Sequence, residues 1–94
     1  MSVLIVELEV SPGGEDNLEL VFAGTFRPAI SAQPGFEAVT LLRPERGQRW
    51  LLEIRFVNEE RRLAWVATER HQAVWPEIDR LCAQVKSELF EAVI

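Results

Sequence analysis

The periodicity of apolar residues changes along this chain, and the order of the changes restricts the fold more than any other feature. Residues 3–10 alternate, so that one side of the segment carries only Leu4, Val6, Leu8 and Val10. The other side begins with Val3 and Ile5 and becomes polar at Glu7 and Glu9. A period of two residues is typical of a β-strand with one buried face.

A helical pattern replaces this alternation after the turn-forming residues 11–14. Glu15 and Asp16 suit the first turn of a helix because they lie at the positive end of its dipole. The apolar residues that follow at helical spacing are Leu18, Val21, Phe22, Phe26 and Ile30. Gly24 and Pro28 weaken this helix, and we expect Pro28 to kink it or to end its regular part.

Two alternating segments follow, residues 36–43 and 49–57, around a turn at 44–48. They predict a β-hairpin. The next helix is expected to start at Glu59, after Val57 or Asn58, because acidic residues occupy its first turn.

Residues 62–78 hold two of the three tryptophans and the only histidine. The segment predicts two short helices that meet at Thr68, with Trp65 in the last turn of the first and Thr68 as N-cap of the second. Pro76 is expected to open a further short turn over residues 77–82 and to hold Trp75 toward extended geometry. Residues 85–93 alternate weakly, as in an edge strand.

The resulting order is β-α-β-β-α-β, without a repeat or linker. It predicts an α+β, ferredoxin-like fold with an antiparallel sheet, formed by a single domain over residues 1–94. The first and third strands are expected to be central, with both helices on one face of the sheet. The opposite face is bare in a monomer.

Composition narrows the range of partners. A net charge of −5 opposes binding to a phosphate backbone, so we expect no nucleic-acid partner. No apolar run approaches the roughly 20 residues of a membrane-spanning helix, and no signal peptide is recognisable, so the expected location is the cytoplasm. One Cys and one His provide no metal-ligand cluster. A domain this small is often stabilised by association.

Several short motifs resemble one known family. Pro12-Gly13, residues 34–36, the strand at 50–56, Ala64-Trp65 and residues 68–71 occur in the order and spacing of the antibiotic biosynthesis monooxygenase domain. The resemblance spans nearly the whole chain. It implies a homodimer in which two sheets pair, bare face to bare face, into a dimeric α+β barrel, with a pocket in each protomer between sheet and helices.

The resemblance also implies activities. Some members of this family oxidise polycyclic aromatic substrates with O2 and without metal or flavin, others degrade haem, and a shared fold does not choose among them. We expect a cofactor-independent monooxygenase-like protein that acts on a hydrophobic aromatic small molecule. The alternative is a dimeric barrel protein without catalysis, which binds a small molecule or has a structural role. Whether the chain is an enzyme stays open.

Haem degradation is disfavoured within this resemblance. Haem-degrading members have an Asn on the first strand, a Trp on the second helix and a His ten residues after that Trp. Trp65 matches the Trp, but Trp75 occupies the position of the His, the first strand carries Glu7, and His71 comes only six residues after Trp65. We therefore expect no cofactor.

The candidate catalytic residues are His71 and Asn58. The candidate substrate-binding residues are Trp65, Trp75, Phe22 and Arg55. Cofactor-free members rely partly on tyrosines, and this chain has none. A substrate phenol would then need a hydrogen-bonding partner among Asn58, Arg55, Arg61 and His71.

Each candidate also has a structural interpretation. Trp65 is expected to pack in the core, and Trp75 to pack there or at a dimer contact. The imidazole of His71 could bond to the backbone of the cap, as in a capping box, or act as a general base. Arg55 is expected opposite Glu7 or Glu9, where it would pair with their charges. Cys82 is expected as a small buried residue late in the second helical region.

Overall fold

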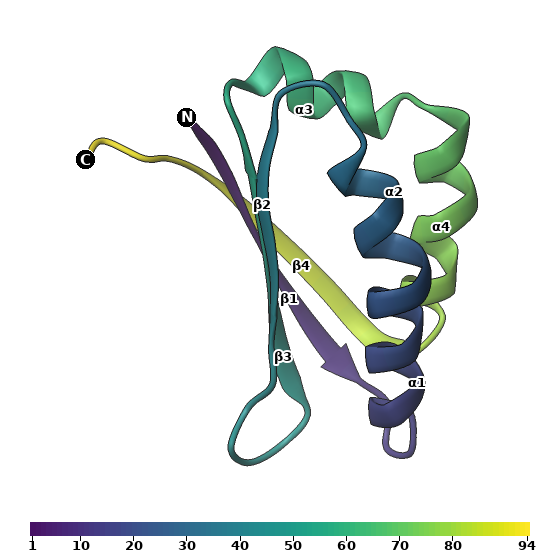
Figure 1. Cartoon of the computed structure of the whole chain (residues 1–94). Coiled ribbons are helices and arrows are strands. Elements are labelled where there is room, and N and C mark those ends of the chain that lie inside the picture. The colour runs from purple at the N-terminus through teal and green to yellow at the C-terminus, as the bar shows by residue number, and fades with distance from the viewer.

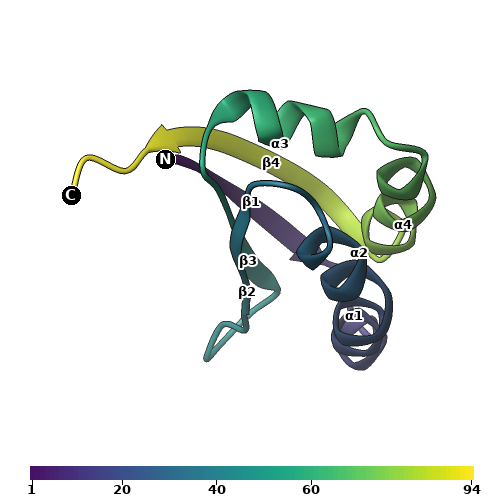
Figure 2. The same cartoon turned by 45° about the horizontal axis from the view of Figure 1, so that its top comes forward.

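The computed structural model describes residues 1–94 and confirms the predicted α+β, ferredoxin-like architecture. Its elements are β1 (Ser2–Val10), α1 (Glu15–Val21), η1 (Phe22–Phe26), α2 (Arg27–Ser31), β2 (Phe36–Leu42), β3 (Arg49–Phe56), α3 (Glu59–Val66), α4 (Glu69–Asp79) and β4 (Cys82–Glu91). The antiparallel sheet has the order β2-β3-β1-β4, so β1 and β3 are central. All helices lie on one side of the sheet (Figures 1 and 2). None of them is long and apolar enough to cross a membrane.

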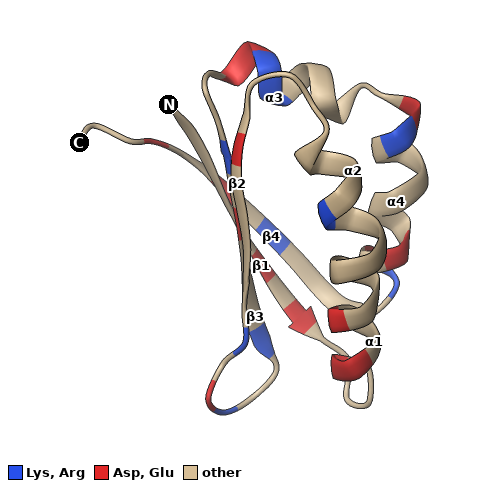
Figure 3. Ribbon diagram, viewed as in Figure 1, with Lys and Arg blue, Asp and Glu red and all other residues tan.

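The alternation in the sequence sorts side chains onto two faces. On the helix-covered face, Leu8 pairs with Trp50 and Leu4 with Ile54. Most of these side chains belong to one apolar core of 15 buried residues. The bare face carries the intervening residues, including Ile5, Glu7 and Arg55, and charged positions recur along its strands (Figure 3). Pairing of β1 with β3 therefore places one apolar surface under the helices, as predicted.

The first helix runs without a break from Glu15 to Ser31 through α1, η1 and α2, but its middle segment, η1, is a π-helix. Pro28 has no N–H and cannot bond to the carbonyl of Gly24. The chain widens just before it, where the Arg27 N–H donates to the Phe22 carbonyl. The regular α-helix thus ends ahead of Pro28, but the helix itself continues.

The wider turn also serves packing. The buried residues Leu18, Phe22, Phe26 and Ile30 are four apart. In a regular α-helix each such step turns about 40° beyond one full turn, so the stripe would drift away from the sheet. A π-helical turn has more residues per turn and reduces this drift.

The predicted corner at Thr68 is confirmed. Asn58 Oδ1 accepts from the Arg61 N–H at 2.9 Å and caps α3. Thr68 Oγ1 accepts from the His71 N–H at 3.0 Å and caps α4, and Trp65 lies in the last turn of α3.

Three predictions beyond this corner are wrong. Pro76 opens no new turn but lies inside α4, and Trp75 is helical rather than extended. Proline removes only one backbone hydrogen bond here, and the burial of Val74 and Ile78 on either side of it holds the helix together. Cys82 does not belong to the helical region but starts β4, because its backbone is already opposite Val10 of β1.

The predicted pairing of Arg55 is also wrong. Arg55 lies opposite Val3, while Leu51 lies opposite Glu7 and Arg49 opposite Glu9. Glu7 instead pairs with Arg49, Oε1 to Nη1 at 3.2 Å. The sequence predicts which face these charges occupy, but the register decides which of them meet.

Candidate functional site

A cavity of about 190 Å³ lies between the sheet and the corner formed by α3 and α4. The sheet contributes Leu4, Val6, Ile54, Val85 and Ser87, and the helices contribute Phe26, Arg62, Trp65, Val66, His71 and Trp75. Eight of these 11 residues are hydrophobic. An apolar cavity with a few polar groups is the usual form of a small-molecule site.

Three aromatic side chains form one wall of this cavity. The Phe26 ring meets Trp65 edge to face at a centroid distance of 6.0 Å and Trp75 at 6.3 Å. Such pairs contribute about 0.5–1.5 kcal/mol beyond the area they bury. Trp65 belongs to the core and lines the cavity at the same time, so its two predicted roles are compatible.

His71 completes the aromatic wall. Its ring meets Trp65 edge to face at 5.0 Å and stacks on Trp75 at an interplanar angle of 16°. The predicted capping-box bond of the imidazole is absent, because Nδ1 is buried and has no hydrogen-bond partner. The cap at Thr68 uses the backbone N–H of His71 instead, which leaves its side chain to line the cavity.

The surroundings of His71 favour its neutral form. Burial lowers the pKa of the imidazole below its ordinary value of 6.5, and the positive charge of Arg62 lowers this pKa further. A neutral imidazole can accept a proton near pH 7. No carboxylate or carbonyl orients it through Nδ1, however, so His71 lacks the second partner of a catalytic triad.

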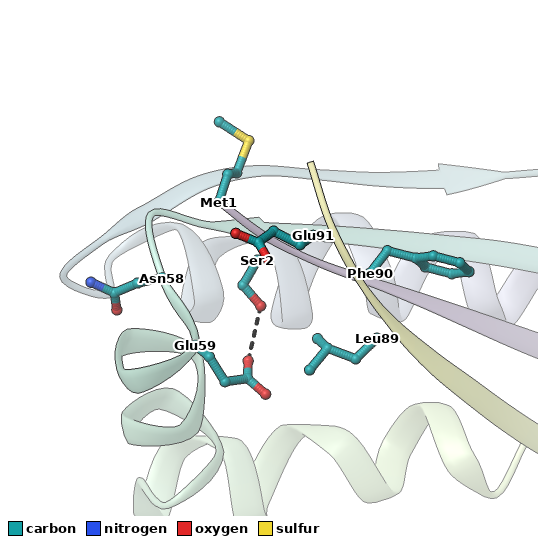
Figure 4. A pocket seen from close by; sticks show the side chains of 7 residues that line it. All are labelled: Met1, Ser2, Asn58, Glu59, Leu89, Phe90 and Glu91. Atoms are coloured by element: carbon teal, nitrogen blue, oxygen red, sulfur yellow. Dashed lines mark hydrogen bonds between the residues drawn. The ribbon is translucent and has the colours of Figure 1, made fainter. Parts of the chain in front are cut away.

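Arg62 is the one charged residue that lines the cavity. Its side chain is only 14% exposed, and Glu59 one turn earlier accepts from Nε at 2.6 Å and from Nη2 at 2.7 Å. This pair raises the pKa of Arg62 and lowers the pKa of Glu59. Glu59 also accepts from the Ser2 hydroxyl at 2.9 Å, which links α3 to β1 (Figure 4).

Arg62 was not among the site residues predicted from the sequence. A signal was present, since Glu59, Arg62 and Trp65 follow one another at intervals of three residues and therefore share one side of a helix. A surface ion pair gives the same pattern, so the burial of the guanidinium could be known only from the structure.

The structure brings together three of the six predicted site residues, Trp65, Trp75 and His71. Phe22 lies outside the cavity lining, where it stacks on Phe26 at 6.2 Å and carries the Arg27 guanidinium over its ring. Arg55 lies on the bare face, with Nη1 3.2 Å from the sulfur of Met1.

Asn58 lines a different and larger hollow of about 370 Å³ near the chain ends (Figure 4). Glu59, Glu91 and Phe90 are among its seven lining residues. Only three of the seven are hydrophobic, and no group there resembles the aromatic wall. The side-chain oxygen of Asn58 is already used in the cap of α3. We therefore regard the smaller cavity as the candidate site.

No group of three or more His, Cys, Asp or Glu side chains is placed to hold a metal ion. The single thiol, Cys82, has a pKa raised by burial and by the charge of Asp79, which keeps it protonated. The cavity itself offers apolar walls, a neutral imidazole and a guanidinium. These groups can enclose a small apolar ligand and contact an oxygen atom on it.

Known proteins share this fold. A provisionally assigned antibiotic biosynthesis monooxygenase from Nitrosomonas europaea superimposes with a TM-score of 0.86 at 16% identity, over 100% of both chains. MhuD, as a variant with two manganese protoporphyrin IX per active site, gives 0.82 at 27% identity, over 100% of this chain and 96% of MhuD. SnoaB, a cofactor-independent oxygenase from Streptomyces nogalater, gives 0.81 at 22% identity, over 99% of this chain and 93% of SnoaB.

Sequence comparison agrees with this structural likeness. No curated protein matches the chain. The antibiotic biosynthesis monooxygenase family matches residues 1–75, which include the aromatic wall, Arg62 and His71 of the cavity. The chain therefore belongs to the antibiotic biosynthesis monooxygenase family.

Proposed function

We propose that this protein is a cofactor-independent monooxygenase-like protein that acts on a hydrophobic aromatic small molecule bound in the cavity under α3 and α4. The observation that carries the proposal is the aromatic wall of Phe26, Trp65 and Trp75, with His71 and Arg62 beside it. Family membership supports the reaction class, and SnoaB, a cofactor-independent oxygenase, has the same fold.

The cavity size suggests a small substrate. An apolar cavity of about 150 Å³ accepts benzene, and this one measures about 190 Å³. Ligand pockets for larger molecules usually have about 300–1,000 Å³. We infer a substrate of one or two fused rings, such as a naphthol, rather than a larger polycycle.

The reaction balances without a cofactor. A naphthol loses its hydroxyl proton, and the anion transfers one electron to O2. The two radicals combine through a new C–O bond at a ring carbon, and protonation gives a hydroperoxide. Loss of the C–H proton forms the carbonyl while the O–O bond breaks, and the departing hydroxide takes up a proton as water. The sum is naphthol + O2 → naphthoquinone + H2O.

The residues of the cavity have distinct parts in this proposal. The aromatic wall excludes water from the reactive anion and positions the ring. The neutral imidazole of His71 accepts the hydroxyl proton and returns it to the peroxide. Asn58 has no part in it, because it caps α3 at the other hollow.

The active form is proposed to be a homodimer. The bare face presents Ile5 and Leu51 among charged residues, and Phe90 of β4 remains 46% exposed. A second copy of the sheet would cover these apolar groups and close a barrel. The charges beside them would then need partners across strands or subunits.

The experiment is O2 uptake with 1-naphthol, measured for the wild type, His71→Gln and the surface control Arg70→Met, whose arginine is exposed on α4. We expect one O2 consumed per quinone formed in the wild type, with activity retained in a metal chelator. His71→Gln should be about 10²- to 10⁴-fold slower, the usual contribution of a general base, and the control should be unchanged. Equal rates with and without protein would contradict the proposal.

A second candidate function is binding without catalysis. It is favoured by the unpartnered Nδ1 of His71, since a base that nothing orients is a weak catalyst. Under this alternative, 1-naphthol raises the melting temperature by mass action but is not oxidised. Haem degradation is opposed by the cavity volume of about 190 Å³. A haem titration should give no shift of the Soret band.

A further inference from the structure

The ion pair beside the cavity leaves part of Arg62 without a partner. A guanidinium has five N–H groups, and Glu59 accepts from two of them, one on Nε and one on Nη2. Three therefore remain, two of them on Nη1. No other protein group accepts from this side chain, although only 14% of it is exposed. The free Nη1 nitrogen is not fully buried, because His71 Nδ1 is the only fully buried side-chain nitrogen or oxygen without a partner. Its N–H groups can therefore contact water or a ligand in the cavity that Arg62 lines.

We propose that Arg62 is a specificity-determining residue that makes the cavity select aromatic anions, by donating its free N–H groups to an anionic oxygen on the ligand. Glu59 is the positioning residue that fixes the guanidinium. This inference rests on the proposed function, because it requires that the cavity binds the ligand. It adds that the ligand oxygen held by Arg62 is negatively charged, either as a carboxylate or as the phenolate that remains once His71 has accepted the hydroxyl proton.

The geometry explains why a flexible side chain can discriminate. Both carboxylate oxygens of Glu59 contact Arg62, and Ser2 from β1 holds one of them at 2.9 Å. The guanidinium is therefore oriented before a ligand arrives, which reduces the entropy lost on binding. Glu59 also balances the charge of Arg62, so the unliganded cavity contains no uncompensated ion.

The size of the preference follows from the kind of bond. Hydrogen bonds that involve a charged group are stronger than neutral ones, by enough to change affinity about tenfold to a hundredfold. Burial is the larger cause of the lowered pKa of His71, and the positive charge of Arg62 lowers this pKa further. The same charge should favour the ionised form of a phenol held against Arg62 and lower its pKa, although burial alone would raise the pKa of a phenol.

A purely structural role for Arg62 is the competing explanation. In that case the ion pair only links α3 to β1 through Glu59 and Ser2. Its loss would lower the free energy of unfolding but would affect charged and neutral ligands alike. The preference between the two kinds of ligand therefore separates the explanations, even where the variants differ in stability.

The test uses three ring-sized probes, 4-nitrophenol, 4-nitrobenzoate and the neutral 4-nitroanisole, with affinities read from quenching of tryptophan fluorescence. The proteins are the wild type, Arg62→Met, Arg62→Lys, Glu59→Gln and the control Arg70→Met, whose arginine is exposed on α4. The absorbance of 4-nitrophenol additionally gives the pKa of the bound probe.

We expect the wild type and Arg70→Met to bind an anionic probe at least tenfold more tightly than 4-nitroanisole, and to lower the pKa of bound 4-nitrophenol. Arg62→Met should lose both the preference for anionic probes and the lowered pKa of bound 4-nitrophenol. Arg62→Lys should keep part of the preference and of the pKa change, and Glu59→Gln should reduce both. A stronger preference for the benzoate assigns the oxygen to a carboxylate, and one for the nitrophenolate assigns it to a phenol.

Two results overturn the proposal, and they are distinguishable. Equal binding of anionic and neutral probes by the wild type, or an anion preference that survives in Arg62→Met, removes the role of Arg62 and leaves the ligand cavity intact. Failure of every probe to bind removes the ligand cavity as well, and with it the proposed function.

Discussion

The two faces of the sheet are built from the same strands but reach opposite environments. On β3, Trp50, Leu52 and Phe56 are at most 1% exposed under the helices. The residues between them, Leu51 and Glu53, stay half-buried on the face that no helix covers. The covered face has its partners within the chain and encloses a cavity. The bare face mixes apolar and charged side chains, and its apolar part is suited to contact with another sheet.

The two faces are therefore proposed to have different roles in the molecule. The cavity of the covered face carries the proposed chemistry, whereas the bare face carries the proposed association. A substitution on either face should therefore disturb one property and leave the other largely intact.

The largest effect is expected at the centre of the bare face. Ile5→Lys places an unpaired charge inside the proposed barrel, at a cost of several kcal/mol per copy. Sedimentation velocity should show a dimer for the wild type and a monomer for the variant. Leu63→Lys is the control, because Leu63 is 53% exposed on α3. A wild-type monomer, or a variant that still dimerises, would contradict the barrel.

The next effect belongs to the covered face. Trp65→Ala removes a side chain that is 2% exposed and contacts Phe26 and His71. The free energy of unfolding should fall by about 3–5 kcal/mol, as is usual for a buried aromatic residue. Urea unfolding measures this change. Leu63→Ala on the same helix should cost less than about 0.5 kcal/mol, and similar losses in the two variants would place Trp65 outside the core.

A smaller effect is expected at the corner that orients His71. Thr68→Ala removes the side-chain acceptor of the His71 N–H and should cost about 1 kcal/mol, whereas Thr68→Ser should retain most of the stability. Chemical denaturation of the two variants measures the difference. If alanine and serine behave alike, the cap contributes nothing to the corner.

The smallest effect concerns pH. The pKa of His71 is lower in the folded chain than its ordinary value of 6.5, so the unfolded chain binds the proton more tightly. The neutral form of His71 therefore contributes to the free energy of unfolding. This contribution is present above about pH 6.5 and is lost as the pH falls through the lower pKa of the folded chain. The free energy of unfolding, measured at several pH values, should decline as the pH falls. This decline should be smaller in His71→Gln. The pKa of Glu59 is lowered from 4.5, so its contribution is lost only at more acidic pH. An unchanged pH profile in His71→Gln would contradict the burial of the imidazole.

Local patterns were sufficient to predict most of the fold. Alternation in β1 predicted its buried face, Thr68 predicted the cap of α4, and the acidic pair at Glu59 predicted the start of α3, because these features depend on neighbours in sequence. The prediction of a new turn at Pro76 was wrong, because the burial of Val74 and Ile78 stabilises α4 by more than one missing hydrogen bond destabilises it. The partner of Arg55 could not be predicted, since it depends on the register between two strands.

The site was predicted only in part. Trp65, Trp75 and His71 are close in sequence and meet in the cavity. Phe22 falls outside it, because it lies one helical turn before Phe26, which is the phenylalanine that lines the cavity. Arg62 was missed because its role depends on burial beside β1, through Glu59 and Ser2, and a helical charge pair alone does not indicate burial.

We propose that the cavity of the covered face, and no other surface of the molecule, binds the aromatic ligand. The three tryptophans test it directly, because Trp65 and Trp75 line the cavity whereas Trp50 is buried elsewhere on the same face. Their indole N–H signals can be followed by ¹H–¹⁵N NMR during titration with 1-naphthol, after assignment with Trp→Phe variants. We predict that the signals of Trp65 and Trp75 shift and that the signal of Trp50 stays in place. A shift of Trp50 alone, or of none of the three, would contradict the account.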